Sequence, residues 1–142
     1  MDNIDVVRAI ERAWDTHDEG ALDSLIAPDF QAHTPGSELL DAGLEGAKNA
    51  HRASMQAMPD MRAEVIRIVA SGKKVAVHAR YSGTDTGGFM PGMPPTGKRI
   101  TMDGIDISEI DDDGKQVSHY GIQDTMAAMM QLGLMTPPGG TD

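Results

Sequence analysis

The chain has 142 residues, which is the usual size of one domain. Its formal net charge is −10, so the protein is strongly acidic. That balance, with scattered basic residues, excludes a nucleic-acid partner and an anionic membrane surface, since both require clustered Lys and Arg. The absence of cysteine excludes disulfides and thiolate chemistry, and no apolar run approaches the ~20 residues that span a bilayer. The N-terminus lacks the basic-then-apolar order of a signal peptide, so we expect a cytoplasmic protein.

Helical spacing dominates the first sixty residues. Val7, Ile10 and Trp14 recur at steps of three and four residues, which predicts an opening helix with Trp14 on its core face. A longer helix is expected over residues 44–58, with His51 on its apolar stripe. Two shorter elements are expected between them, a helix over 22–26 that Pro28 closes and an extended piece over 30–33.

Beyond residue 61 the apolar period changes to two, which predicts strands. These strands are expected over 62–70, 74–82, 99–110 and 116–124, with a short closing helix over 125–132. In the third strand Ile100 and Met102 precede Gly104, whereas Ile105 and Ile107 follow it in the opposite phase. A β-bulge at Gly104 would explain this slip.

Helices followed by an antiparallel meander predict an α+β fold. We expect a curved antiparallel sheet with the N-terminal helices packed across its concave face, forming a cone with an internal pocket. A single domain is expected over residues 1–135, and residues 136–142 are expected to form a disordered tail.

Two motif-like stretches do not meet the requirements of the sites that they resemble. Residues 92–98 have the spacing of a phosphate-binding loop, but Arg99 stands where a Ser or Thr must hold magnesium. Residues 109–114 resemble the start of a calcium loop, but Tyr120 occupies the position that requires a bidentate Glu. We therefore predict no metal and no cofactor.

The last strand carries the main candidate for chemistry. Alternation places Tyr120, Ile122 and Asp124 on one face, and His119 and Gln123 on the other. If the face with Tyr120 and Ile122 is buried, Asp124 lies in an apolar cavity that raises its pKa and makes it a better base. Asp124 also directly precedes a predicted helix, where Asp is a favoured N-cap, and capping is the alternative role.

Other candidates depend on which way their side chains point. His51 and His33 are either pocket residues or histidines bonded to backbone carbonyls. The burial of Asp106 depends on the register at Gly104, which sequence does not fix. The indole N–H of Trp14 needs a partner that a pocket rim could supply.

Taken together, ordered segments of the chain resemble the SnoaL-like polyketide cyclase family. The segments are PPTGK at 94–98, GIDI at 104–107, DGK at 113–115, His119-Tyr120 with Asp124, and QLG at 131–133. The resemblance implies the cone fold shared with ketosteroid isomerase and nuclear transport factor two. It further implies ring closure by intramolecular aldol condensation without metal or cofactor, with Asp124 as acid/base, and a homodimer or homotetramer. The chain departs from many relatives at Tyr120, where they carry Trp, and at Asp85, where they carry His.

We therefore predict a cofactor-independent cyclase or isomerase that acts on an apolar, carbonyl-rich small molecule, with Asp124 as the catalytic residue. Two alternatives stay open, a non-catalytic ligand-binding module of the same fold and a hydrolase that activates water at Asp124. The residues predicted to contact substrate are Trp14, His33, His51, Met90, Met102, Asp106, His119 and Tyr120.

Overall fold

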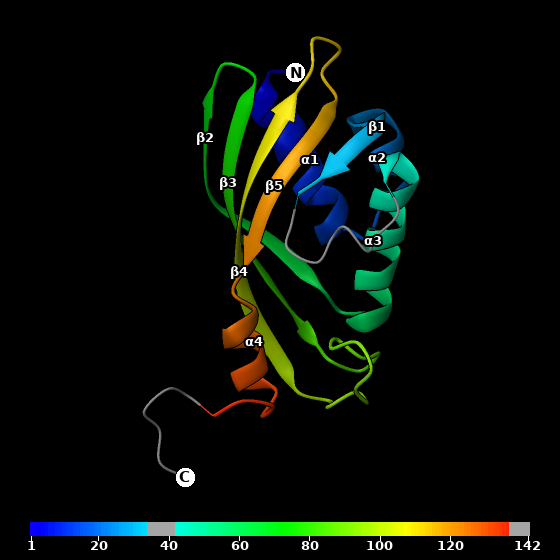
Figure 1. Ribbon diagram of the computed structural model, residues 1–142, viewed down its shortest axis with the longest axis vertical. Helices are drawn as coiled ribbons and strands as arrows, with labels where there is room; N and C mark the ends of the chain where they lie inside the picture. Colours follow the sequence, from blue (N-terminus) through cyan, green and yellow to red (C-terminus); the bar gives the residue numbers. More distant parts are fainter. Residues whose placement is uncertain (34–41, 137–142) are drawn as a thin grey trace.

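Five strands form one curved sheet in the order β1-β5-β4-β3-β2, seen in the computed structural model of the protein, which describes residues 1–33 and 42–136 (Figure 1). The strands are β1 (Ile26–Ala32), β2 (Arg62–Ser71), β3 (Lys74–Thr84), β4 (Arg99–Ile110) and β5 (Gln116–Gln123). The helices are α1 (Asn3–Asp15), the 3₁₀ turn η1 (Glu19–Ala21), α2 (Leu22–Leu25), α3 (Gly43–Ala57) and α4 (Thr125–Gln131). The α+β class, the curved sheet and the helices packed against it are as the sequence predicts.

Strands β2 to β5 form the predicted antiparallel meander, but β1 pairs with β5 in parallel, so the sheet is mixed. Strand β1 also begins at Ile26 and runs through Pro28, where the sequence predicted the end of a helix. Pro28 is tolerated because β1 is an edge strand whose pairing with β5 is irregular between Ile26 and Gln31. The missing N–H of the proline therefore interrupts no regular ladder.

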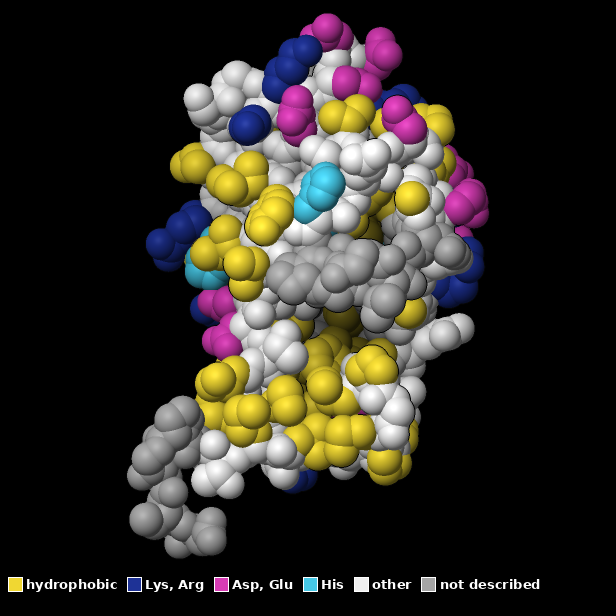
Figure 2. Space-filling view, viewed as in Figure 1, with side chains coloured by type: hydrophobic (Ala, Val, Ile, Leu, Met, Phe, Trp, Pro, Cys, Tyr) yellow, Lys and Arg dark blue, Asp and Glu magenta, His cyan; other side chains and the backbone are white. Residues whose placement is uncertain are grey.

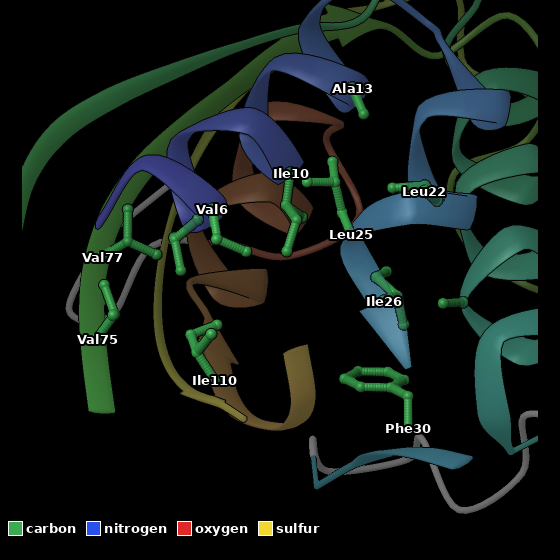
Figure 3. Packing of buried hydrophobic residues seen from close by; sticks show 12 residues of the cluster. Val6, Ile10, Ala13, Leu22, Leu25, Ile26, Phe30, Val75, Val77 and Ile110 are labelled. Atoms are coloured by element: carbon green, nitrogen blue, oxygen red, sulfur yellow. The ribbon is translucent and has the colours of Figure 1, made fainter. Parts of the chain in front are cut away.

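The main core lies between α1, α2, β1 and β3. Helix α1 begins with a reciprocal capping box, in which Asp2 and Asp5 each accept a hydrogen bond from the other's backbone N–H. Its apolar stripe then packs on the sheet, as Figure 3 shows for Val6 beside Val77. This packing fixes the rotation of α1, and hence the direction in which its remaining side chains point.

A second cluster closes the other end of the molecule. It consists of Met58, Met61, Ile100, Met102, Ala128 and Leu132. Helix α4 contributes Ala128, and Leu132 follows that helix directly. The C-terminal helix therefore secures the lower part of β4, as Figure 1 shows.

The bulge predicted at Gly104 is wrong. Strand β4 pairs regularly with both neighbours at this point, since Gly104 lies opposite Ala79 on β3 and opposite Gln123 on β5. Alternation therefore continues, and Ile105 and Ile107 point outward with exposed fractions of 57% and 48%. Asp106 and Ser108 lie on the inner face instead, which changes where the polar groups of the site are found.

In the parts of the chain that the structure describes, no helix is both long and apolar enough to cross a membrane. Most of the predicted tail, from residue 137 onward, lies outside the described residues. The domain boundary at residue 135 stays a prediction.

Candidate active site

A cavity of about 620 Å³ lies between the helices and the inner face of the sheet. Figure 2 shows a hollow in the surface of the molecule on the side that it presents, with apolar side chains gathered around the hollow. The volume falls within the range of ~300–1,000 Å³ that is typical of small-molecule sites. The wall formed by the helices is mainly apolar, whereas the wall formed by the sheet carries polar side chains.

One wall is a helix face made of small side chains. Helix α3 lines the cavity with residues three or four positions apart, the spacing of one helical face. They are Gly43, Gly46, Ala47, Ala50, Ala53, Ser54 and Ala57. Because these side chains are short, they leave room between α3 and the sheet, and the surface that they offer to a ligand is predominantly apolar.

Bulky apolar groups line other parts of the cavity. Trp14, predicted to contact substrate, lines it from α1, and its ring meets the His51 ring edge-on with centroids 4.7 Å apart. Further large apolar side chains on the lining include Phe30, Phe89, Met58, Met61 and Met102. Met102, also predicted to contact substrate, lies on this lining.

The sheet wall is polar. Its contributors are Tyr81 from β3, Asp106 and Ser108 from β4, and Gln116, His119 and Gln123 from β5. Asp106 and Gly121 are directly paired across β4 and β5, so no side chain from β5 lies beside the carboxyl at that pair. Among the described lining residues there is no Lys or Arg to neutralise the carboxyls.

The most buried acid in the cavity is Glu11 of α1, which is 8% exposed. The hydroxyl of Tyr81 donates a hydrogen bond to its Oε2 at 2.9 Å. Burial raises the pKa of Glu11 to about 7; the Tyr81 hydrogen bond opposes this rise and the nearby charge of Asp106 adds to it. Burial also raises the pKa of the Tyr81 hydroxyl, which therefore stays a donor.

Asp106, which was predicted to contact substrate, is the second carboxyl on the cavity lining. Burial raises its pKa to about 6. His119, another predicted residue, lines the same wall, and burial together with the charge of His33 lowers its pKa. Its ring packs edge-on against Phe30, with centroids 5.3 Å apart. Two carboxyls with raised pKa values thus share one partly dry space, an arrangement suited to proton transfer.

Asp124 lies elsewhere. The face of β5 that carries Tyr120 and Ile122 points outward, with exposed fractions of 59% and 61%, and Asp124 is exposed as well. Its carboxylate accepts a hydrogen bond from the backbone N–H of Ala127 at 3.1 Å and caps α4. The predicted location of Asp124 in a dry pocket is therefore wrong, and the alternative role of N-cap is the one observed.

Four further predicted residues lie outside the cavity lining. His51 is buried in the core, where its Nε2 hydrogen-bonds the Ala13 carbonyl at 2.9 Å. His33 is exposed and stacks on the exposed ring of Tyr120. Met90 packs against the second apolar cluster instead of lining the cavity.

Asp85 organises the long loop after β3. It is 1% exposed and accepts hydrogen bonds from the backbone N–H groups of Gly88, Phe89 and Thr96 and from the Thr96 hydroxyl. Burial would raise its pKa, but these hydrogen bonds outweigh burial and lower it. The loop also bonds to α3, since the N–H of Gly87 donates to the Ala57 carbonyl at 3.0 Å. Asp85 thereby holds Gly88, Phe89 and Pro91 at the cavity wall.

Within the described residues, no group of three or more His, Asp, Glu or Cys side chains is arranged to hold a metal ion.

Sequence reasoning missed Glu11 and Tyr81 as site residues. A signal for Glu11 was present, since Val7, Glu11 and Trp14 lie on one helical stripe, where an acid interrupts an apolar face. Tyr81 alternates in phase with the buried Val75 and Val77 on β3, but its hydroxyl partner could not be inferred from the sequence.

Comparison with known proteins relates the chain to one family. The family model described as SnoaL-like polyketide cyclase matches residues 4–132. Among solved structures, wild-type IdmH from Streptomyces antibioticus, named as a candidate polyketide cyclase, is 32% identical with a TM-score of 0.80, covering 94% of this chain and 99% of that chain. TsrD from Streptomyces laurentii is 25% identical with a TM-score of 0.83, covering 92% of this chain and 94% of that chain. A search of curated proteins gave no match.

Proposed function

Because the chain belongs to the SnoaL-like polyketide cyclase family, we propose that it is a cofactor-independent cyclase or isomerase of an apolar, carbonyl-bearing small molecule, with the cavity as its active site and Asp106 as its base. The observation that carries the proposal is the pair of carboxyls in a largely apolar cavity, Glu11 from α1 and Asp106 from the polar sheet wall. A carboxyl kept in such a space is a stronger base than one in water, and it can also return a proton.

The reaction is an intramolecular aldol-type ring closure or a related rearrangement. Asp106 removes a proton from a carbon that is flanked by carbonyls, and the enolate carbon attacks a second carbonyl of the same molecule. A proton then reaches the new alkoxide, so the product is an isomer of the substrate. Such a C–H bond is already fairly acidic, and a carboxylate with a pKa near 6 is a competent base for it.

The cavity supports this reaction by shape as well as by acidity. The small side chains on α3 and the aromatic rings of Trp14, Phe30 and Phe89 leave a space that a flat or folded apolar chain can occupy. Holding the two reacting carbons of one chain together contributes to the rate because the entropy of their encounter is already lost on binding. An uncharged substrate fits best, since the described lining offers no cation for an acid group.

The test uses benzoylacetone, a small 1,3-diketone, as a probe. Its central methylene exchanges hydrogen for deuterium in heavy water, and proton NMR follows the exchange with and without protein. We expect the wild-type protein to accelerate exchange and Asp106→Asn to lose that acceleration by roughly 100-fold or more, the usual contribution of a positioned base.

The matched control is Asp124→Asn, the same substitution at an exposed carboxyl where Asn can still cap α4. It should keep the wild-type exchange rate. Loss of activity in Asp124→Asn together with full activity in Asp106→Asn would refute the assignment and restore the role predicted from the sequence. A wild-type protein that binds the probe without accelerating exchange would instead support the ligand-binding module.

We further propose that the protein forms a homodimer or homotetramer through the outer face of its sheet. Ile105 and Ile122 are directly paired across β4 and β5, as are Ile107 and Tyr120, and all four are exposed. Paired apolar side chains form a continuous patch that water solvates poorly. Sedimentation should show a dimer or tetramer that Ile122→Lys dissociates, and a 15.1 kDa species for the wild-type chain would refute the proposal.

A further inference from the structure

We propose that Glu11 is a second catalytic group, a neutral carboxylic acid that protonates the substrate oxygen while Asp106 takes the proton from carbon, and that Tyr81 is the residue that positions it. The inference rests on the proposed function and assigns the second half of the proton transfer. The starting observation is a carboxyl, that of Glu11, at a position on α1 where apolar packing would favour an apolar side chain. Glu11 lies on the apolar stripe of α1, 8% exposed, at the wall of the cavity.

The geometry of the Tyr81 contact favours a defined site for the proton. Tyr81 donates to Oε2 of Glu11 at 2.9 Å, so this oxygen acts as the acceptor. In a neutral carboxyl the carbonyl oxygen is the better acceptor, which favours Oε1 as the oxygen that carries the proton. One oxygen is therefore held by the protein and the other is left to donate.

Glu11 and Asp106 lie in different environments, and the difference favours Glu11 as the acid and Asp106 as the base. The groups that act on Glu11 are Tyr81 on β3 and Asp106 on β4, and His119 on β5 lines the same cavity. The pKa of Asp106 is about 6 and that of Glu11 about 7, because Glu11 is more deeply buried and also responds to the charge of Asp106. Glu11, the more deeply buried of the two, therefore keeps its proton to higher pH than Asp106, so one site offers an acid and a base together.

The proton balance closes within the site. The proton of the reacting carbon passes to Asp106, and the electron pair of the C–H bond forms the new C–C bond. The carbonyl that is attacked becomes an alkoxide and takes the proton of Glu11. Transfer of one proton from Asp106 to Glu11, directly or through water, restores both groups, and no further reactant is consumed.

Keto–enol conversion of benzoylacetone tests the assignment, because it needs proton removal from carbon and proton delivery to oxygen. Its rate is followed by ultraviolet absorbance from pH 5 to pH 9 for the wild-type protein, Glu11→Gln, Tyr81→Phe and the control Glu45→Gln. Glu45 is an exposed acid on α3 that lies outside the cavity lining. We expect a bell-shaped profile for the wild type, with limbs near 6 and 7.

Glu11→Gln should lower the rate about 100-fold and remove the alkaline limb, since Gln accepts the Tyr81 hydrogen bond but donates no acid proton. Tyr81→Phe should move the alkaline limb to higher pH, because the hydrogen bond that lowers the pKa of Glu11 is lost. A residue with a merely structural role would move neither limb. The profile of Glu45→Gln should match the wild type.

The failures of the two proposals are distinguishable. If Asp106→Asn is inactive while Glu11→Gln keeps the wild-type rate and both limbs, the role of Glu11 is refuted and the cyclase proposal stands. If the wild-type protein does not accelerate the conversion, both are contradicted. Carbon-13 NMR of the Glu11 carboxyl adds a readout that needs no substrate, and a Glu11 that is already ionised at pH 6 would overturn the assignment.

Discussion

Replacing Glu11 with Gln should change how the stability of the protein depends on pH, whatever its substrate is. The pKa of Glu11 is about 7 in the folded protein, against a usual value of 4.5. At 1.36 kcal/mol for each pH unit between these values, ionising Glu11 in the folded state costs about 3 kcal/mol. Because Glu11 is only 8% exposed, solvent screening reduces this cost little.

The sign follows from the raised pKa. Below pH 4.5 the carboxyl is protonated in both the folded and the unfolded chain, and it imposes no electrostatic cost. As the pH rises from 4.5 to about 7 the unfolded chain loses the proton first, so the free energy of unfolding falls. Above this window the loss is complete. Glu11→Gln has no carboxyl to ionise, but it keeps an acceptor for the Tyr81 hydroxyl. Its free energy of unfolding relative to the wild type should therefore rise by about 3 kcal/mol between pH 4.5 and pH 8.

Urea unfolding followed by circular dichroism from pH 4 to pH 8.5, at one fixed protein concentration, measures the difference. Asp106 contributes its own decline in stability as its pKa of about 6 is passed, but it is present in both proteins and the comparison largely removes it. Glu45→Gln is the control for the loss of one negative charge at an exposed site. Parallel curves for the wild type and Glu11→Gln would refute the burial and the raised pKa of Glu11.

Two further predictions concern groups outside the cavity lining. Asp124→Ala should lower the free energy of unfolding by about 1 kcal/mol in urea titrations, because the hydrogen bond from the Ala127 N–H that caps α4 is lost. The same substitution should leave keto–enol conversion unchanged, and a large loss of activity would contradict the capping role. Gly87→Ala should loosen the loop, since an added Cβ would lie 1.7 Å from the Gln56 carbonyl oxygen, and should destabilise by about 1–3 kcal/mol with faster protease cleavage in the loop. Met93→Ala at an exposed loop position is its control, and equal cleavage of the two variants would contradict the close contact.

Much of the fold could be predicted because helices and strands follow local periodicity. The stripe of Val7, Ile10 and Trp14 and the alternation of Val75 and Val77 correctly identify the buried faces of α1 and β3. The parallel pairing of β1 with β5 could not be predicted in the same way. It joins segments nearly ninety residues apart, and neither strand carries a pattern that specifies its neighbour.

The site was predicted only in part, and the errors on β4 and β5 have one physical cause. Trp14, Met102, Asp106 and His119 line the cavity as expected, whereas the expected catalytic residue Asp124 does not. On β5 the rule that apolar residues point inward selected the face with Tyr120 and Ile122, which is the outer one.

The same rule produced the bulge that was expected at Gly104, which would have kept Ile105 and Ile107 inside. The rule fails in the middle of β4 and along β5 because the inner face there borders a cavity and not a packed core. The sheet supplies acidic and amide side chains to the cavity wall at inward positions such as Asp106 and Gln116.

The outward orientation of apolar residues on β4 and β5 also bears on the assembly of the protein. Strands that point their polar residues into a cavity have only their outer face left for apolar burial, and on β4 and β5 that face carries Ile and Tyr in directly opposed pairs. A second copy covering this patch would remove apolar area from water and so offset part of the cost of keeping Glu11 and Asp106 in a dry cavity. On this reasoning the outer patch and the acidic cavity are two consequences of one strand pattern. A variant that dissociates the oligomer, such as Ile122→Lys, should then lose stability even though it touches no residue of the cavity lining.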